Sequence, residues 1–195
     1  TLDNVKDRNS VQVSTDVLRI LKKDLENAKA AQDLFEAIIG TKKNRKNPRE
    51  LLKNNPNLHI NARFGTNKKT SLMQCIYVGD SCVDVGKAIF KRPQLDISIK
   101  DKGGWTCLHY VCGWGCYGIG KPLLKRNDIG SILNEKTPDG STPLDILFGY
   151  IAQSPYIFRG LSDINLWCKM VRQGAVLGKC KQDYNKLTLS NKTYN

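Results

Sequence analysis

Four residues of the kind that bind metals lie close together in the middle of the chain. Cys107, His109, Cys112 and Cys116 fall within ten residues, and thiolate and imidazole are preferred ligands of Zn²⁺. A zinc site requires all four side chains to converge on one point. The apolar spacing of this segment instead predicts a short helix that turns Cys107 and Cys112 toward a core. We therefore expect structural roles for these residues, with no bound metal or other cofactor.

The same segment contains a candidate nucleophile, because a cysteine activated by a histidine is a common catalytic pair. Cys107 and His109 are two residues apart, and side chains at this spacing on a helix do not face each other. The sequence therefore predicts no catalytic residues and no enzymatic activity.

The number and placement of the cysteines bear on the cellular compartment. The seven cysteines are an odd number, and Cys75, Cys107 and Cys112 fall on core-facing helical positions, where cysteine behaves as a small apolar residue. This usage favours a reducing compartment over a disulfide scaffold. We expect a cytoplasmic protein, with the host cytoplasm after secretion as one form of that location.

The elements that hold these residues follow a repeat. A threonine stands two residues before a leucine at Thr70, Thr106 and Thr142, and successive leucines are 36 residues apart. A fixed period in this range is typical of stacked repeats. Each threonine is expected to be a helix N-cap, whose hydroxyl accepts a hydrogen bond from a backbone N–H one turn later. Pro143 suits the first helical position, where the N–H it lacks has no partner.

Each of these helices is expected to have a turn before it and a second helix after it. The turns contain glycine, which supplies the positive φ of tight turns, and they lie at residues 64–67, 101–104 and 139–140. The second helices are helix-like runs at residues 85–90, 122–124 and 166–171. A turn and two helices thus make up each unit.

These residues resemble the ankyrin repeat, whose unit carries Asp-x-x-Gly-x-Thr-Pro-Leu-His-x-Ala. Residues 101–112 read Asp-Lys-Gly-Gly-Trp-Thr-Cys-Leu-His-Tyr-Val-Cys, and Gly115 stands where the family ends its first helix. The third unit has Asp145 in the histidine position, and the first has Met73 there. The likeness covers residues 49–177, with a period three residues longer than the family's, which is about 33.

The resemblance implies an all-α fold, a stack of three to four helix–turn–helix units with short hairpin loops and an N-terminal helical cap. It also implies that His109 supports the hairpins by hydrogen bonding and that Cys112 packs between helices in place of an alanine. Ankyrin-type stacks offer a long concave surface and usually no catalytic pocket. The function implied by the resemblance is that of a protein-interaction scaffold or adaptor.

Three regions are expected along the chain. They are a helical cap and basic linker at residues 1–48, the repeats at 49–177 with an insertion at about 149–164, and a loose polar tail at 178–195. The cap would be an amphipathic helix over residues 14–39 that begins at Ser14 or Thr15, packs its broad apolar side on the stack and stops at Gly40.

Positive charge dominates all but the first 40 residues. The net charge of +13 divides into −1 for residues 1–40 and +14 for residues 41–195. The densest run contains Lys42, Lys43, Arg45, Lys46 and Arg49. Such a field keeps a protein soluble and attracts acidic proteins, anionic lipid or nucleic acid. Solubility is the simpler explanation, and we expect a protein partner with an acidic surface rather than nucleic acid.

Aromatic residues recur at the first-helix positions that line the concave face in ankyrin-like stacks. Tyrosine and tryptophan commonly anchor protein interfaces. The expected partner-binding residues are Tyr77, Tyr110, Trp114 and Tyr150, with Trp105, Lys68 and Lys69 at the rim. In the alternative interpretation, Trp114 and Tyr117 fill gaps left by the glycine-rich residues 113–120.

The sequence thus predicts a protein-interaction module. Its divergent, lysine- and asparagine-rich composition is what a bacterial effector or a parasite protein acting in a eukaryotic cytosol would show. Two other functions stay open: an accessory stack that delivers a catalytic domain outside residues 1–195, or a nucleic-acid or anionic-lipid binder acting through residues 42–49. No apolar run reaches about 18 residues, so we expect no transmembrane segment.

Overall fold

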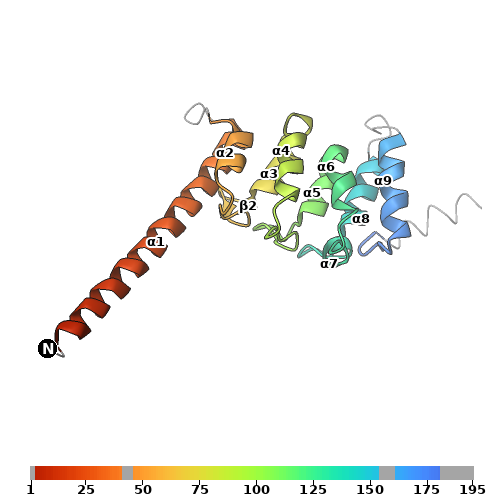
Figure 1. Ribbon diagram of the computed structural model, residues 1–195. Coiled ribbons are helices and arrows are strands. Elements are labelled where there is room, and N and C mark those ends of the chain that lie inside the picture. The colour runs from red at the N-terminus through yellow and green to blue at the C-terminus, as the bar shows by residue number, and fades with distance from the viewer. Residues whose placement is uncertain (1–2, 41–45, 154–160, 181–195) are drawn as a thin grey trace, which may run out of the picture.

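The chain is mostly helical, as predicted (Figure 1). The computed structural model describes residues 3–40, 46–153 and 161–180, with side chains placed in residues 15–40, 46–149 and 165–180. Two short strands in this part of the chain, β1 (Arg63–Phe64) and β2 (Lys69–Thr70), form an antiparallel hairpin in which Arg63 pairs with Thr70. The helices are α1 (Asp3–Ile39), α2 (Pro48–Asn54), α3 (Ser71–Val78), the 3-10 turn η1 (Asp80–Cys82), α4 (Val83–Phe90), α5 (Cys107–Trp114), α6 (Tyr117–Leu123), α7 (Gly130–Leu133), α8 (Pro143–Gln153) and α9 (Leu161–Arg172).

The main helices form two layers. Helices α1, α3, α5 and α8 contact one another in that order and make up what we call the first-helix layer. Helices α2, α4, α6 and α9 contact one another in the same way and make up the second-helix layer. Each first helix also packs on the second helix that follows it, so that the pairs succeed one another along the molecule (Figure 1). One core of buried apolar side chains runs between the layers from Ala30 to Ala175.

Threonine caps begin the first helices, as the sequence predicts. The Thr70 hydroxyl accepts from the Met73 N–H at 3.3 Å, and the Thr142 hydroxyl accepts from the Asp145 N–H at 3.2 Å. In the middle helix, the ring Nδ1 of His109 lies 2.9 Å from the Thr106 hydroxyl and accepts from the Thr106 N–H. These bonds satisfy backbone donors that the first turn of a helix leaves without partners.

Glycines allow the second helices to approach one another closely. A Cβ at Gly86 of α4 would lie 2.5 Å from a side-chain carbon of Ile119, and one at Gly118 of α6 would lie 2.7 Å from a side-chain carbon of Val83. The helix-like run predicted for the middle second helix covers residues 122–124, whereas α6 spans Tyr117–Leu123. That prediction was wrong because glycine has a low helix propensity, and here close packing requires it inside the helix.

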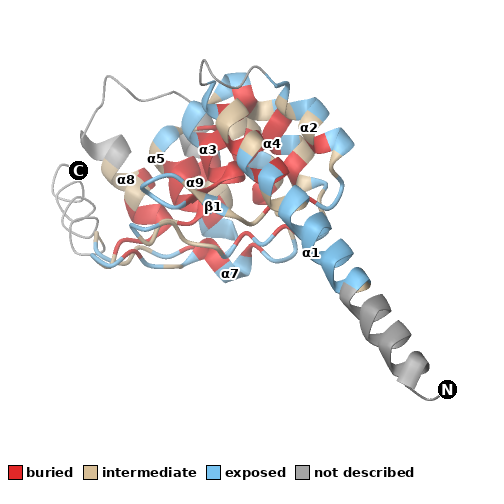
Figure 2. Ribbon diagram, turned by 90° about the vertical axis from the view of Figure 1, so that its left-hand side faces the viewer, coloured by how far each residue is buried: buried red, intermediate tan, exposed pale blue. Residues whose placement is uncertain are grey.

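The N-terminal helix packs less completely than predicted. It begins at Asp3 rather than near residue 14, and only its last turns enter the core, through Ala31, Leu34 and Ile38. The apolar side chains nearer its start are exposed: Val17, Leu18, Ile20, Leu21 and Leu25. The cause is length, because α1 has 37 residues and its neighbour α3 has 8. The uncovered part projects from the other helices (Figures 1 and 2), and the helix ends before Gly40 at a φ of 72°, as expected.

The C-terminal boundaries also differ from the prediction. Helix α8 continues to Gln153 and α9 begins at Leu161, so the interruption expected at 149–164 is partly helical, and residues 154–160 lie outside the described residues. The start of the expected loose tail is anchored, since the N–H groups of Gly178, Lys179 and Cys180 all donate to the Asp145 carboxylate. Residues 181–195 lie outside the described part of the chain.

Candidate functional site

Four of the predicted partner-binding residues meet where α3 and α5 lie side by side. Trp114 contacts Tyr77, Trp105 and Tyr110, with ring centroids 5.3, 5.6 and 5.2 Å apart, and the ring of Tyr110 stacks on it at 26°. Trp105 also meets Tyr110 edge to face at 5.6 Å. We call these four residues the aromatic cluster. Spacings of this size are favourable for aromatic pairs, so the cluster is one packed unit.

Tyr77 and Trp114 form the exposed surface of the aromatic cluster. Their side chains are 46% and 39% exposed, respectively. Tyr77 lies near the end of α3 and Trp114 ends α5, so both belong to the first-helix layer. A pair of large rings that touch each other and still face solvent is a suitable anchor for a partner protein.

Tyr110 does not lie on the surface, which corrects the prediction for this residue. It is 4% exposed, and its hydroxyl donates to Asp101 Oδ2 at 2.8 Å. Burial, then the hydrogen bond to Asp101 and that residue's charge, raises the pKa of Tyr110 far above its ordinary value. Tyr110 was expected to point outward because of its helical position, but the neighbouring Trp114 covers it. Its role in the aromatic cluster is support for the exposed rings.

Lys69 is also buried rather than at the rim. It is 9% exposed, and its ammonium group lies 3.7 Å from the ring centre of Tyr77 and 5.0 Å from that of Tyr110. Burial is the largest influence on Lys69 and lowers its pKa, while the charge of Asp101 acts in the opposite direction. The rings attract the cation through their negative faces. A positive charge thus lies directly beneath the exposed ring of Tyr77.

Asp101, which was not predicted as a site residue, connects the aromatic cluster to the neighbouring turn. Its Oδ1 accepts from the N–H groups of Gly103 and Trp105 at 2.9 and 2.8 Å, while its Oδ2 accepts from Tyr110. The signal available in the sequence was its position at the start of residues 101–112, the segment that resembles the ankyrin motif. A carboxylate with three donors fixes the turn and the tyrosine in one geometry.

The remaining predicted site residues fall in different places. Lys68 is exposed at the hairpin turn, with a left-handed φ of 53°. Trp105 is half-buried against His109 and the other rings, so it supports the surface more than it extends it. The side chain of Tyr150 lies outside the described residues.

The cysteine and histidine segment is used for packing. The Cys107 thiol points to the Ile97 carbonyl, and the Cys112 sulfur lies 3.7 Å from the Met170 sulfur. Burial raises the pKa of both thiols, to about 12 for Cys107. In the ranges that the structure describes, no three His, Cys, Asp or Glu residues are placed to hold a metal ion.

A second pair of thiols lies under the end of α3. Cys75 donates a hydrogen bond to the sulfur of Cys82, which is the main reason why the pKa of Cys82 is lowered to about 6. Both side chains are buried, so the Cys82 sulfur lacks the access to a substrate that a nucleophile requires.

The basic run at residues 42–49 is less available than its sequence indicates. Lys46 pairs with Asp33 at 2.6 Å, and Arg49 pairs with Asp84. Lys42, Lys43 and Arg45 lie outside the described residues. The two described cations therefore serve partly to hold α1, α2 and α4 together.

No protein-family model matches the chain, and no curated protein is significantly similar to it. Among the described residues, no helix has the length and apolar character needed to cross a bilayer.

Proposed function

We propose that the chain is a divergent ankyrin-type repeat stack. The order of turn, first helix and second helix, together with the 36-residue spacing of the capped leucines, supports this. A side-chain contact also recurs between successive units. Asn61 donates to the Gln94 carbonyl and accepts from the Asp96 N–H, while Asn134 donates to the Gly174 carbonyl and accepts from the Val176 N–H. Each asparagine thereby joins its own unit to the loop that ends the next one.

We infer that this stack is a protein-interaction module without catalytic activity. The observation that carries the inference is the aromatic cluster, in which Tyr77 and Trp114 present touching, exposed rings on a supported base. Hot-spot residues of interfaces are enriched in tryptophan and tyrosine, and rigid aromatic anchors lose little conformational entropy on binding.

The charge around the aromatic cluster favours a partner with an acidic surface. Lys69 holds a partly desolvated positive charge below Tyr77, and Lys68 extends from the adjoining turn. A carboxylate of the partner next to the rings would meet both cations. The buried charge would contribute to affinity, while the exposed Lys68 would mainly raise the association rate.

The proposed location is a reducing cytosol, including that of a host cell reached by secretion. The support is the use of cysteine: five of the seven are buried and no disulfide joins the described residues. Thiols that pack as apolar residues are compatible with a compartment in which they stay reduced.

Affinity capture from a eukaryotic lysate with three baits tests the function. Wild-type protein and Val171→Ala, a matched change of an exposed apolar residue on α9, should capture the same protein. Tyr77→Ala should weaken that capture by about 2 kcal/mol or more, roughly 30-fold. Tyr77 is the better choice than Trp114, which packs on three rings and also contributes to stability. Equal capture by all three baits would refute the proposed surface.

A further inference from the structure

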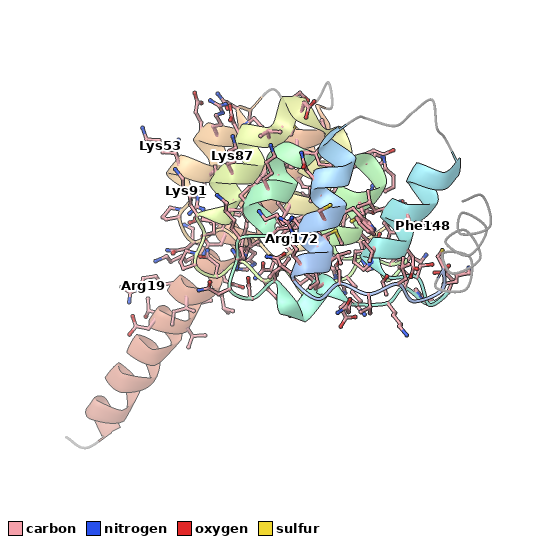
Figure 3. All side chains as sticks on the ribbon, turned by 90° about the vertical axis from the view of Figure 1, so that its right-hand side faces the viewer. Arg19, Lys53, Lys87, Lys91, Phe148 and Arg172 are labelled. Carbon is pink, nitrogen blue, oxygen red and sulfur yellow. The ribbon has the colours of Figure 1, made fainter. Side chains whose placement is uncertain are left out.

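The second-helix layer carries basic residues at a regular spacing. Lys53, Lys87 and Lys121 follow one another at intervals of 34 residues, as do Lys91 and Lys125. Lys169 and Arg172 occupy the last turn of the fourth second helix. We call these seven residues the basic ladder. In Figure 3, the labelled Lys53, Lys87 and Lys91 project from one side of the molecule, away from Phe148 of α8.

No described residue neutralises the basic ladder. Six of its members are exposed, Lys169 is half-buried, and none forms an ion pair with a described residue. Interaction with helix dipoles would be a simpler explanation for the positions of these cations, because a cation near a helix C-terminus stabilises the helix. The last turns of α1, α3, α5 and α8, however, contain no basic residue. The cations thus follow one face of the molecule rather than helix ends in general.

Two surface grooves between neighbouring second helices open among these residues. One, between α2 and α4, has a volume of about 650 Å³ and is lined by Lys53, Lys91 and Arg92, together with apolar and amide side chains. Arg49 also lines this groove, but it is paired with Asp84. The other, between α6 and α9, has a volume of about 200 Å³ and is lined by Lys121, Lys125 and Lys169. In the part of the chain that the structure describes, no carboxylate lines either groove. Both grooves therefore suit phosphate-bearing groups.

We propose that the basic ladder binds the surface of a membrane containing anionic phospholipids, with lipid headgroups entering the two grooves. The basic ladder shares no residue with the 42–49 run, whose described cations are paired. Polybasic surfaces of four to eight lysines and arginines bind anionic bilayers, and each residue near the surface strengthens binding by about fivefold. Lipids diffuse laterally, so headgroups can match whatever spacing the second helices impose.

Nucleic acid fits the same surface less well. Proteins that bind single strands stack bases on exposed aromatic rings, and the described residues of the ladder helices include no exposed aromatic side chain. Packed helices place the steps of the ladder evenly, about 10 Å apart. The backbones of a duplex alternate instead between grooves of about 12 and 6 Å. A mobile array of headgroups is the better match.

Membrane binding through the basic ladder would leave the aromatic cluster free. The two surfaces belong to different helix layers, since Tyr77 and Trp114 lie on α3 and α5. A membrane-bound molecule would therefore present its partner-binding surface away from the second-helix layer. The proposal adds a membrane-docking role to the proposed interaction module without depending on it.

Vesicle co-sedimentation at physiological salt tests this proposal with the whole chain. We expect binding to vesicles of phosphatidylcholine with about one third phosphatidylserine, and none to phosphatidylcholine alone. Lys87→Glu with Lys121→Glu should weaken binding by about 25-fold or more, from about fivefold for each lysine lost. The matched control is Lys102→Glu with Lys136→Glu, which makes the same change in net charge at exposed loop residues.

The control variant should bind as the wild type does. Equal loss in both variants would show that net charge alone drives binding and would overturn the proposal, as would absence of binding by the wild type. Tighter binding of a DNA or RNA duplex than of the vesicles, at the same salt, would assign the ladder to nucleic acid instead. Circular dichroism verifies folding, and Lys87→Gln with Lys121→Gln replaces the charge reversal if that variant unfolds.

Discussion

Replacing Asp145 by asparagine tests how the last unit and the segment after α9 are held together. The carboxylate is 3% exposed and accepts five hydrogen bonds. Four of them reach Oδ2, from the N–H and hydroxyl of Thr142 at 2.8 and 2.9 Å and from the N–H groups of Gly178 and Lys179 at 2.9 and 3.1 Å. The fifth reaches Oδ1, from the Cys180 N–H at 2.9 Å.

The magnitude follows from these contacts. An amide keeps one acceptor oxygen for the four donors at Oδ2, but its NH₂ then faces the Cys180 N–H, so that bond is lost and the others are no longer charge-assisted. A hydrogen bond to a charged group contributes about 1.5–3 kcal/mol. We expect Asp145→Asn to lower the free energy of unfolding by about 2–4 kcal/mol.

Urea unfolding followed by circular dichroism measures this loss, with Asp84→Asn as the matched control. The Asp84 side chain is 62% exposed in its pair with Arg49, and exposed pairs contribute up to about 1 kcal/mol. A midpoint for Asp145→Asn equal to that of Asp84→Asn would refute the anchoring role.

Acidification provides an independent test of Asp145. Burial acts to raise the pKa of Asp145, but the hydrogen bonds from Thr142, Cys180 and Gly178 outweigh it and leave the pKa below its ordinary value of 3.8. The native state therefore favours the ionised form. Its stabilisation is present above pH 3.8 and is lost as the pH falls below that value, and Asp145→Asn should lack this part of the acid dependence.

Three further predictions concern the core of the middle unit. Burial, the largest cause, lowers the pKa of His109 from 6.5, so the stability of the fold should decrease as the pH drops below 6.5. His109→Gln should remove this pH dependence, as measured by thermal melts at several pH values. Leu108→Ala, at a fully buried position, should cost about 2–5 kcal/mol in urea unfolding, and Thr106→Ala, which removes an N-cap, about 0.5–2 kcal/mol; equal effects would contradict the assignment of core and cap. Tyr117→Phe should raise the free energy of unfolding by about 1 kcal/mol in the same assay. The reason is that the Tyr117 hydroxyl is buried without a hydrogen-bond partner in the described part of the chain. A lower free energy of unfolding would contradict this assignment.

The first helices could be predicted from local chemistry alone. Thr70, Thr106 and Thr142 begin their helices as expected, because a cap depends on a side chain and the backbone one turn away. Gly40 ends α1 for a similarly local reason. The second helix at α6 was misplaced because the glycines inside it are required by contacts with other helices, which no local pattern reveals.

The aromatic cluster was predicted as a group but not in its detail. Helical spacing brought Tyr77, Tyr110 and Trp114 to one side, yet which of them reaches solvent depends on how their rings cover one another. The burial of Lys69 depends on two tyrosines from different helices, so its sequence position suggested a rim residue. Asp101 was missed as a site residue for the same reason, since its function lies in contacts across the turn.

The basic ladder has a signal in the sequence, which is the spacing of its lysines. The run at 42–49 is dense because its cations are adjacent in sequence, although the described ones form ion pairs. Lysines 34 residues apart are distant in sequence and adjacent in the structure, because each interval advances by one helix pair. In this chain, charge is therefore better compared between neighbouring helices than along the sequence.

Hydrogen exchange of the protein, free and bound to the partner captured by the wild-type bait, tests the central claim most directly. If the aromatic cluster is the docking surface, bound partner should slow exchange in residues 71–78 and 107–114, which contain Tyr77 and Trp114. Residues 83–90 and 117–123, in the second-helix layer, should exchange as in the free protein. Protection confined to the second-helix layer, or to the exposed part of α1, would contradict the account.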